Sequence, residues 1–77
     1  MSNHSIEVFG LPAKKAVKRF LGLTHLPTQD MMVDAYERML REEPDTLTIR
    51  SELGFSDPRV RRRVTDVVQT QRQCVGV

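Results

Sequence analysis

The sequence predicts an all-α protein, a small bundle of about four short helices. Apolar residues recur at spacings of three and four rather than in alternation, which is the pattern of a helix with one buried side. Glycines and prolines divide the chain into four such stretches. With 77 residues, 39% hydrophobic and 29% charged, the chain has the composition of a globular protein and the length of one domain. We expect an N-terminal arm over residues 1–9, a single helical domain over 10–73 and a tail over 74–77.

The first predicted helix begins at Pro12, after a turn at Gly10 and Leu11, and runs up to Gly22. Gly10 provides a turn, and Pro12 suits the first helical turn because its missing N–H would have no partner there. Gly22 ends the helix. The apolar residues of this helix recur at helical spacing, whereas its opposite side is basic and carries Lys14, Lys15, Lys18 and Arg19.

The second predicted helix follows Pro27 and has the clearest apolar stripe in the chain. It ends at Glu42 and Glu43, because the residue before Pro44 is forced out of the helical region. Such a stripe is usually core, but this one is wide for a small domain, and flexible thioethers suit adaptable protein interfaces. We therefore keep two interpretations open, a buried core and a protein-binding or homodimer interface formed by Met31, Met32, Tyr36 and Met39.

Two further helices are predicted in the second half of the chain. Asp45 or Thr46 caps a short third helix, which Gly54 closes. The fourth helix starts where Asp57 supplies a capping side chain and Pro58 occupies the first turn. The inner side of this helix is a stripe of valines at helical spacing, Val60, Val64, Val67 and Val68.

Residues 46–68 resemble the helix-turn-helix family, in which a short helix, a glycine-containing turn and a recognition helix pack at a steep angle. The resemblance is carried by the turn and by the apolar positions of both helices, namely Ile49, Leu53, Gly54, Phe55, Val60 and Val64. Arg50 departs from the pattern, since the family usually has a small residue there. The resemblance implies that the third and fourth helices form a helix-turn-helix-like pair, that the fourth helix reads double-stranded DNA, and that two copies bind paired half-sites as a dimer.

The net charge of +2 conceals an uneven distribution. Residues 1–27 sum to +3, residues 28–56 to −4 and residues 57–77 to +3. The first and fourth helices can therefore face a polyanion, whereas the middle of the chain is unsuited to one.

The arginine run of the fourth helix supplies the residues expected to touch DNA. At about 100° per residue its members spread around the helix, so that Arg59 and Arg62 point toward base edges and Arg61 and Arg63 toward phosphates. The alternative is a solvated side, on which Arg62 pairs with Asp66 four residues later. If the first helix lies beside the fourth, the strip of phosphate contacts continues with Lys14, Lys15 and Lys18.

The sequence carries no pattern that points to catalysis or to a cofactor. Its histidines, His4 and His25, have no ligand-spaced cysteine or acidic cluster beside them, and Cys74 is the only cysteine. We therefore expect no enzyme activity, no catalytic residues, no metal and no cofactor. Since no apolar run is long enough to span a bilayer and the N-terminus lacks the features of a signal peptide, we expect a cytoplasmic protein without a membrane partner.

The function that the sequence predicts is a small, non-enzymatic DNA-binding regulator of transcription. The alternative is an adaptor or inhibitor that docks on another protein through the methionine and tyrosine stripe or through the acidic middle segment. The two functions differ in salt dependence, because phosphate contacts weaken steeply as the salt concentration rises and an apolar interface does not.

Overall fold

The computed structural model describes residues 8–75, with side chains up to residue 73, and this part of the chain is helical without β-strands. The prediction of a small all-α bundle is confirmed. The elements are α1 (Leu11–Leu21), α2 (Gln29–Leu40), the 3-10 turn η1 (Pro44–Thr46), α3 (Leu47–Glu52) and α4 (Pro58–Val75). His4 and the side chain of Cys74 lie outside the described residues, as does most of the expected arm.

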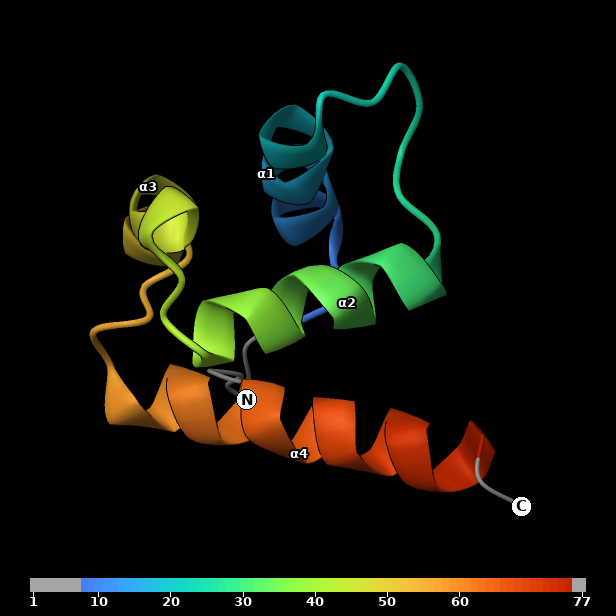
Figure 1. The fold of residues 1–77 in the computed structure, drawn as a ribbon, viewed down its shortest axis with the longest axis vertical. Helices are drawn as coiled ribbons and strands as arrows, with labels where there is room; N and C mark the ends of the chain where they lie inside the picture. The colour runs from blue at the N-terminus through green and yellow to red at the C-terminus, as the bar shows by residue number, and fades with distance from the viewer. Residues whose placement is uncertain (1–7, 76–77) are drawn as a thin grey trace, which may run out of the picture.

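Helix α2 occupies the centre of the fold. It runs side by side with α4 in the opposite direction, and α1 stands across its other side (Figure 1). Helix α3 packs against α1 and is seen nearly end-on in the same view, whereas α4 lies across the picture. The third and fourth helices therefore point in different directions, and α3 has its main helix contact with α1 rather than with α4 (Figure 1).

Most helix ends lie where the sequence predicts them. Gly22 ends α1 in the left-handed region, with φ of 71°, and its N–H donates to the carbonyl of Arg19. At the start of α4, Asp57 Oδ1 accepts a hydrogen bond from the Arg59 N–H at 2.9 Å. Gly54, with φ of 77°, forms the turn before α4. Glycine suits both turns because it adopts positive φ without a Cβ clash.

The start of α3 differs from the prediction that Asp45 or Thr46 caps it. Residues 44–46 form a 3-10 turn instead, and no side chain caps α3. The hydroxyl of Thr46 is buried and donates to the carbonyl of Glu43 at 2.6 Å. The same oxygen accepts a hydrogen bond from Arg50 Nε at 2.9 Å, so that it serves the loop and a side chain rather than the helix end.

The core gathers one stripe from each helix around α2. In α2, Met32 and Met39 are fully buried and Tyr36 is 1% exposed. The opposing helix contributes the valines, of which Val60, Val64 and Val68 are buried. Each fully buried side chain of this size contributes about 1.5–3 kcal/mol relative to exposure.

The segment before α1 belongs to the core, although the sequence placed it in an arm. Val8 is buried, and its carbonyl accepts a hydrogen bond from the Tyr36 hydroxyl. The Phe9 ring lies against the Tyr36 ring, with a centroid separation of 6.5 Å. At the other end, α4 continues to Val75, past the expected boundary at residue 73.

The environment of Tyr36 predicts an unusual titration. Burial raises the pKa of Tyr36 from 10.0 to about 12. Because the pKa in the folded state lies above that of the unfolded chain, this tyrosine's contribution to stability is complete below pH 10 and is lost as the pH rises toward 12. Tyr36 is the only tyrosine, so phenolate absorbance should show a midpoint near 12 in the native protein and near 10 in denaturant. A native midpoint near 10 would contradict its burial.

Candidate nucleic-acid interface

The arginine run of α4 lies on the solvent side of the helix, since the valine stripe turns toward α2. Arg59, Arg61, Arg62 and Arg63 are all exposed. They divide into two groups, because Arg59, Arg62 and Arg63 line one open hollow with Phe9 and Val67. We call these three residues the arginine face. Arg61 lines a different hollow, between α3 and α4.

Arg61, which the sequence assigned to phosphate contact, is held by the chain itself. Its Nη2 lies 2.7 Å from Glu42 Oε2, in the turn that follows α2. Both side chains are about half exposed, at 48% and 54%. An exposed ion pair of this kind contributes little stability, but it leaves Arg61 less available to a phosphate than Arg62 and Arg63, which have no ion pair among the described residues.

Several other arginines also have carboxylate partners, which come mainly from the acidic middle segment. Arg19 of α1 donates two hydrogen bonds to Glu52 of α3, at 2.6 and 2.7 Å. Arg38 bridges Glu43 and Asp45. The carboxylates of the middle segment thus neutralise neighbouring cations.

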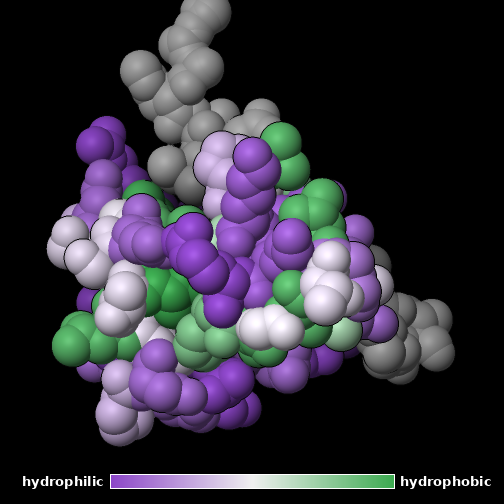
Figure 2. Space-filling model, turned by 90° about the horizontal axis from the view of Figure 1, so that it is seen from above, coloured by the Kyte–Doolittle hydropathy of each residue, from purple (hydrophilic) through white to green (hydrophobic). Residues whose placement is uncertain are grey.

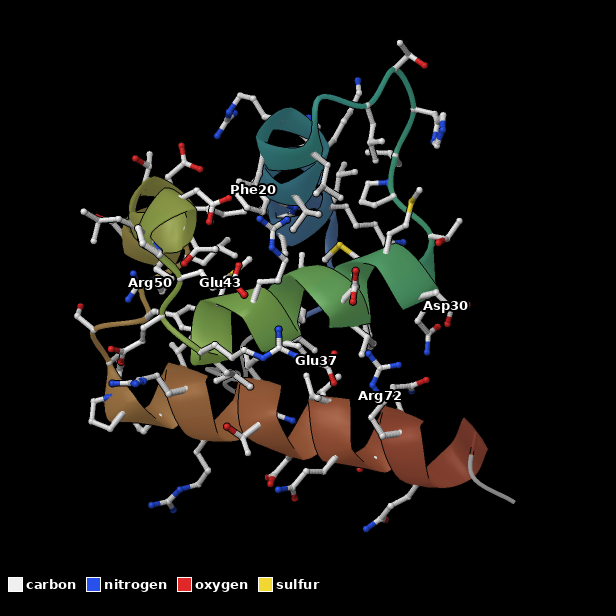
Figure 3. The ribbon with its side chains drawn as sticks, viewed as in Figure 1. Phe20, Asp30, Glu37, Glu43, Arg50 and Arg72 are labelled. Atoms are coloured by element: carbon white, nitrogen blue, oxygen red, sulfur yellow. The ribbon has the colours of Figure 1, made fainter. Side chains whose placement is uncertain are left out.

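Arg72 fixes the far end of α4 to α2. It donates two hydrogen bonds to Glu37 across the space between the two helices (Figure 3). These hydrogen bonds lower the pKa of Glu37 below its usual value, since they stabilise the carboxylate. Arg72 therefore serves the fold, unlike the arginine face on the first turns of the same helix.

The arginine face is almost free of such partners. Among the described residues, neither Arg62 nor Arg63 forms an ion pair or a hydrogen bond to another side chain. The alternative pairing of Arg62 with Asp66 is not formed, although Asp66 lines the same hollow. Arg59 is held only loosely, with Nη2 3.5 Å from Asp57 Oδ2 and an exposed fraction of 89%. The pKa of Asp57 is lowered chiefly by the hydrogen bond from the Arg59 backbone, which belongs to the helix cap.

The lysines of α1 do not continue the arginine face. Helix α2 lies between α1 and α4, and the last turn of α1 points away from α4 (Figure 1). The condition for a continuous strip, that α1 lie beside α4 along its length, is therefore not met. Within the described part of the chain, no ion pair engages these lysines, which form a separate basic surface of Lys14, Lys15 and Lys18.

The methionine and tyrosine stripe of α2 is interior. Met32, Tyr36 and Met39 are at most 1% exposed, and only Met31 reaches the surface in part. The expected docking or dimer surface is therefore not available in this fold, because α1 and α4 already cover it. On the face shown in Figure 2, apolar side chains are interspersed with hydrophilic ones rather than gathered into one broad surface.

The sequence missed two features of this site. Phe9 lines the arginine hollow, although it precedes α1 and is remote from α4 in sequence. Glu42, which the sequence placed on a solvated helix end, is the partner of Arg61 and has a left-handed backbone, with φ of 58°. Helical spacing could have placed Thr70, two turns after Arg63, beside the same hollow.

Comparison with models of known protein families, with curated proteins and with solved structures finds no match. Across residues 8–75, no helix combines the length and the hydrophobicity needed to cross a membrane. The function has to be inferred from the side chains of this chain alone.

Because Arg62 and Arg63 have no ion-pair partner among residues 8–73, we expect that these two arginines are not needed for folding. The variant Arg62→Ala, Arg63→Ala should keep its free energy of unfolding within about 0.5 kcal/mol of the parent, as is typical of exposed substitutions. The neighbouring Val64 is 1% exposed. Val64→Ala should therefore lower the free energy of unfolding by about 2 kcal/mol, because burial is lost and a cavity is left. Urea denaturation measures both values. Equal losses in the two variants would show that the arginines are structural.

Proposed function

We propose that this protein is a small DNA-binding regulator that contacts double-stranded DNA with the arginine face of α4. The observation that carries the proposal is that some arginines pair with carboxylates of the chain and others do not. The acidic groups of the chain hold Arg19, Arg38, Arg61 and Arg72, whereas Arg62 and Arg63 have no such partner among the described residues. Three exposed guanidinium groups thus remain together on one side of the longest helix.

The electrostatics of this face favour an external anion. Arg59 and Arg63 stand one helical turn apart, and like charges at this spacing repel each other. A phosphate between them removes the repulsion and accepts hydrogen bonds from both guanidinium groups. Binding then also gains from the release of counterions from DNA, which drives the association of basic surfaces with nucleic acids.

The shape of α4 fits the same partner. It has 18 residues and is therefore about 27 Å long, with an exposed outer side. An α-helix of this kind enters the major groove of B-DNA, which is about 12 Å wide. In this arrangement Arg59 and Arg62 approach base edges, and Arg63 contacts a phosphate. Arg61 keeps Glu42 as its partner, and the α1 lysines add contacts only where DNA extends beyond α4.

A duplex-binding titration at two salt concentrations tests the proposal. We expect the parent protein to bind mixed-sequence DNA, with an affinity that falls steeply as salt rises from about 50 to about 200 mM. In Arg62→Ala, Arg63→Ala, the loss of the Arg63 phosphate contact should lower the slope of log affinity against log salt by about 0.9 in magnitude, and the loss of the Arg62 base contact should weaken binding further. Fluorescence anisotropy of a labelled duplex measures both slopes.

The matched control removes two arginines that already have partners. Arg19→Ala, Arg41→Ala changes the net charge by the same amount, but both side chains pair with carboxylates and lie off the arginine face. This variant should bind DNA with an affinity close to that of the parent. Equal weakening of the two double variants, or no binding by the parent, would refute the role of α4.

A further inference from the structure

A second hollow lies on the side of the molecule where α2 ends and α3 leads into α4. Its lining is mixed: Met39, Phe55 and Leu47 are apolar, Ser51 and Ser56 are polar, and Glu42, Arg50 and Arg61 are charged. Its volume is about 280 Å³, and it is open to solvent. We call it the α3 hollow. Pockets that enclose small ligands are usually larger, about 300–1,000 Å³, so an open hollow of this size suits a side chain of a partner better than a whole ligand.

Arg50 gives the α3 hollow its distinctive chemistry. It is half-buried and lies between α3 and the end of α2, near Glu43 (Figure 3). Its Nε donates to Thr46 Oγ1 at 2.9 Å, and its Nη2 reaches the carbonyl of Glu43 at 3.4 Å. Both acceptors are neutral, and within residues 8–73 no carboxylate pairs with this guanidinium.

These two hydrogen bonds hold the Arg50 guanidinium in place but do not use all of its N–H groups. Thr46 is fully buried, so its oxygen fixes the position of Arg50 Nε. An arginine carries five N–H groups, of which two are used here, so three remain for an external acceptor. A half-buried cation of this kind gains most from a carboxylate, because charge-assisted hydrogen bonds are strong where water is partly excluded.

Leu47 supplies an apolar contact beside this cation. It is 65% exposed, the highest value among the exposed large hydrophobic residues of the described chain, and it stands three residues before Arg50 on the same side of α3. The hollow therefore offers a positive group next to the apolar side chains of Leu47, Met39 and Phe55. The complementary ligand carries an acidic group next to a bulky apolar group.

We propose that the α3 hollow binds a segment of another protein in which an acidic side chain stands beside a bulky apolar one. The carboxylate would sit against Arg50, and the apolar side chain would lie between Leu47 and Phe55. Nucleic acid is a poor occupant, because Glu42 lies on the wall of the hollow and repels a chain of phosphates. Arg61 also lines this hollow, where it pairs with Glu42, but none of the three residues of the arginine face does.

Peptide titration followed by NMR tests the proposal on the full chain. The probes are acetylated pentapeptides in which Glu or Asp stands next to Leu, Ile, Met or Phe, in either order, and the same peptides with Gln or Asn in place of the acid. We expect saturable shifts of the Ser51, Gly54 and Ser56 amides with acidic members of the panel. The matched amide peptides should bind about tenfold more weakly, since they lack the charged hydrogen bond.

Two variants separate binding from folding. Leu47→Glu changes an exposed side chain and should lower the affinity for the acidic peptides about tenfold, because it adds a repulsive charge and removes an apolar contact. Leu11→Glu makes the same change on α1, where Leu11 is 51% exposed, and should bind like the parent. The Arg62→Ala, Arg63→Ala variant should also bind peptides like the parent, so failure here is distinguishable from failure of DNA binding.

The proposal fails if no acidic peptide gives saturable shifts, if the acidic and amide peptides bind alike, or if Leu47→Glu binds like the parent. Shifts of the same amides by inorganic phosphate alone would reduce the site to an anion site and would also overturn it. So would shifts produced there by duplex DNA, because they would assign the hollow to the nucleic-acid interface.

Discussion

The burial of α2 is the constraint on which the rest of the structure depends. Helix α2 lies between α1 and α4, and the neighbouring helices close off its Met32, Tyr36 and Met39. The remaining helices can then bury a single stripe each. For α4 that stripe is the valines, and the opposite side of an 18-residue helix must face water. The exposed arginines follow from this geometry.

The central position of α2 also determines which arginines of α4 pair with carboxylates. The carboxylates on and after α2 lie within reach of the flanks of α4, so Glu37 pairs with Arg72 and Glu42 with Arg61. They do not reach the outer side, where Arg62 and Arg63 stand. The contrast between paired flanks and an unpaired outer side supports a polyanionic partner for α4. Arg50 is a separate case, because it is held by neutral oxygens in a hollow with a mixed lining.

Local signals in the sequence predicted most of the fold. Pro12, Gly22, Gly54 and Asp57 act through their own backbone or side chain, and each lies at the helix end that it predicted. Apolar spacing likewise predicted the valine stripe of α4. The start of α3 was not predictable in this way, because the Thr46 hydroxyl has its partners in Glu43 and Arg50 rather than in the helix end.

The candidate site was predicted only in part, since it depends on contacts between distant segments. Helical spacing placed the arginines outside, but the pairing of Arg61 with Glu42 and the position of Phe9 depend on how α2 and the chain before α1 meet α4. The separation of the α1 lysines from the arginine face has the same origin, since periodicity does not show which helix lies between two others. The width of the methionine stripe was equally ambiguous, because a central helix and an unpaired docking helix show the same pattern.

The central claim is that the outer side of α4 is left uncovered by the fold and is closed by DNA. Side-chain NMR relaxation of the arginine Nε groups tests this most directly, with Arg72 as the internal reference, in the free protein and with a saturating short duplex. The account predicts that Arg62 and Arg63 are mobile in the free protein while Arg72 is restrained, and that DNA restrains Arg62 and Arg63 without changing Arg72. Arginines that are already restrained without DNA, or that stay mobile in the complex, would contradict it.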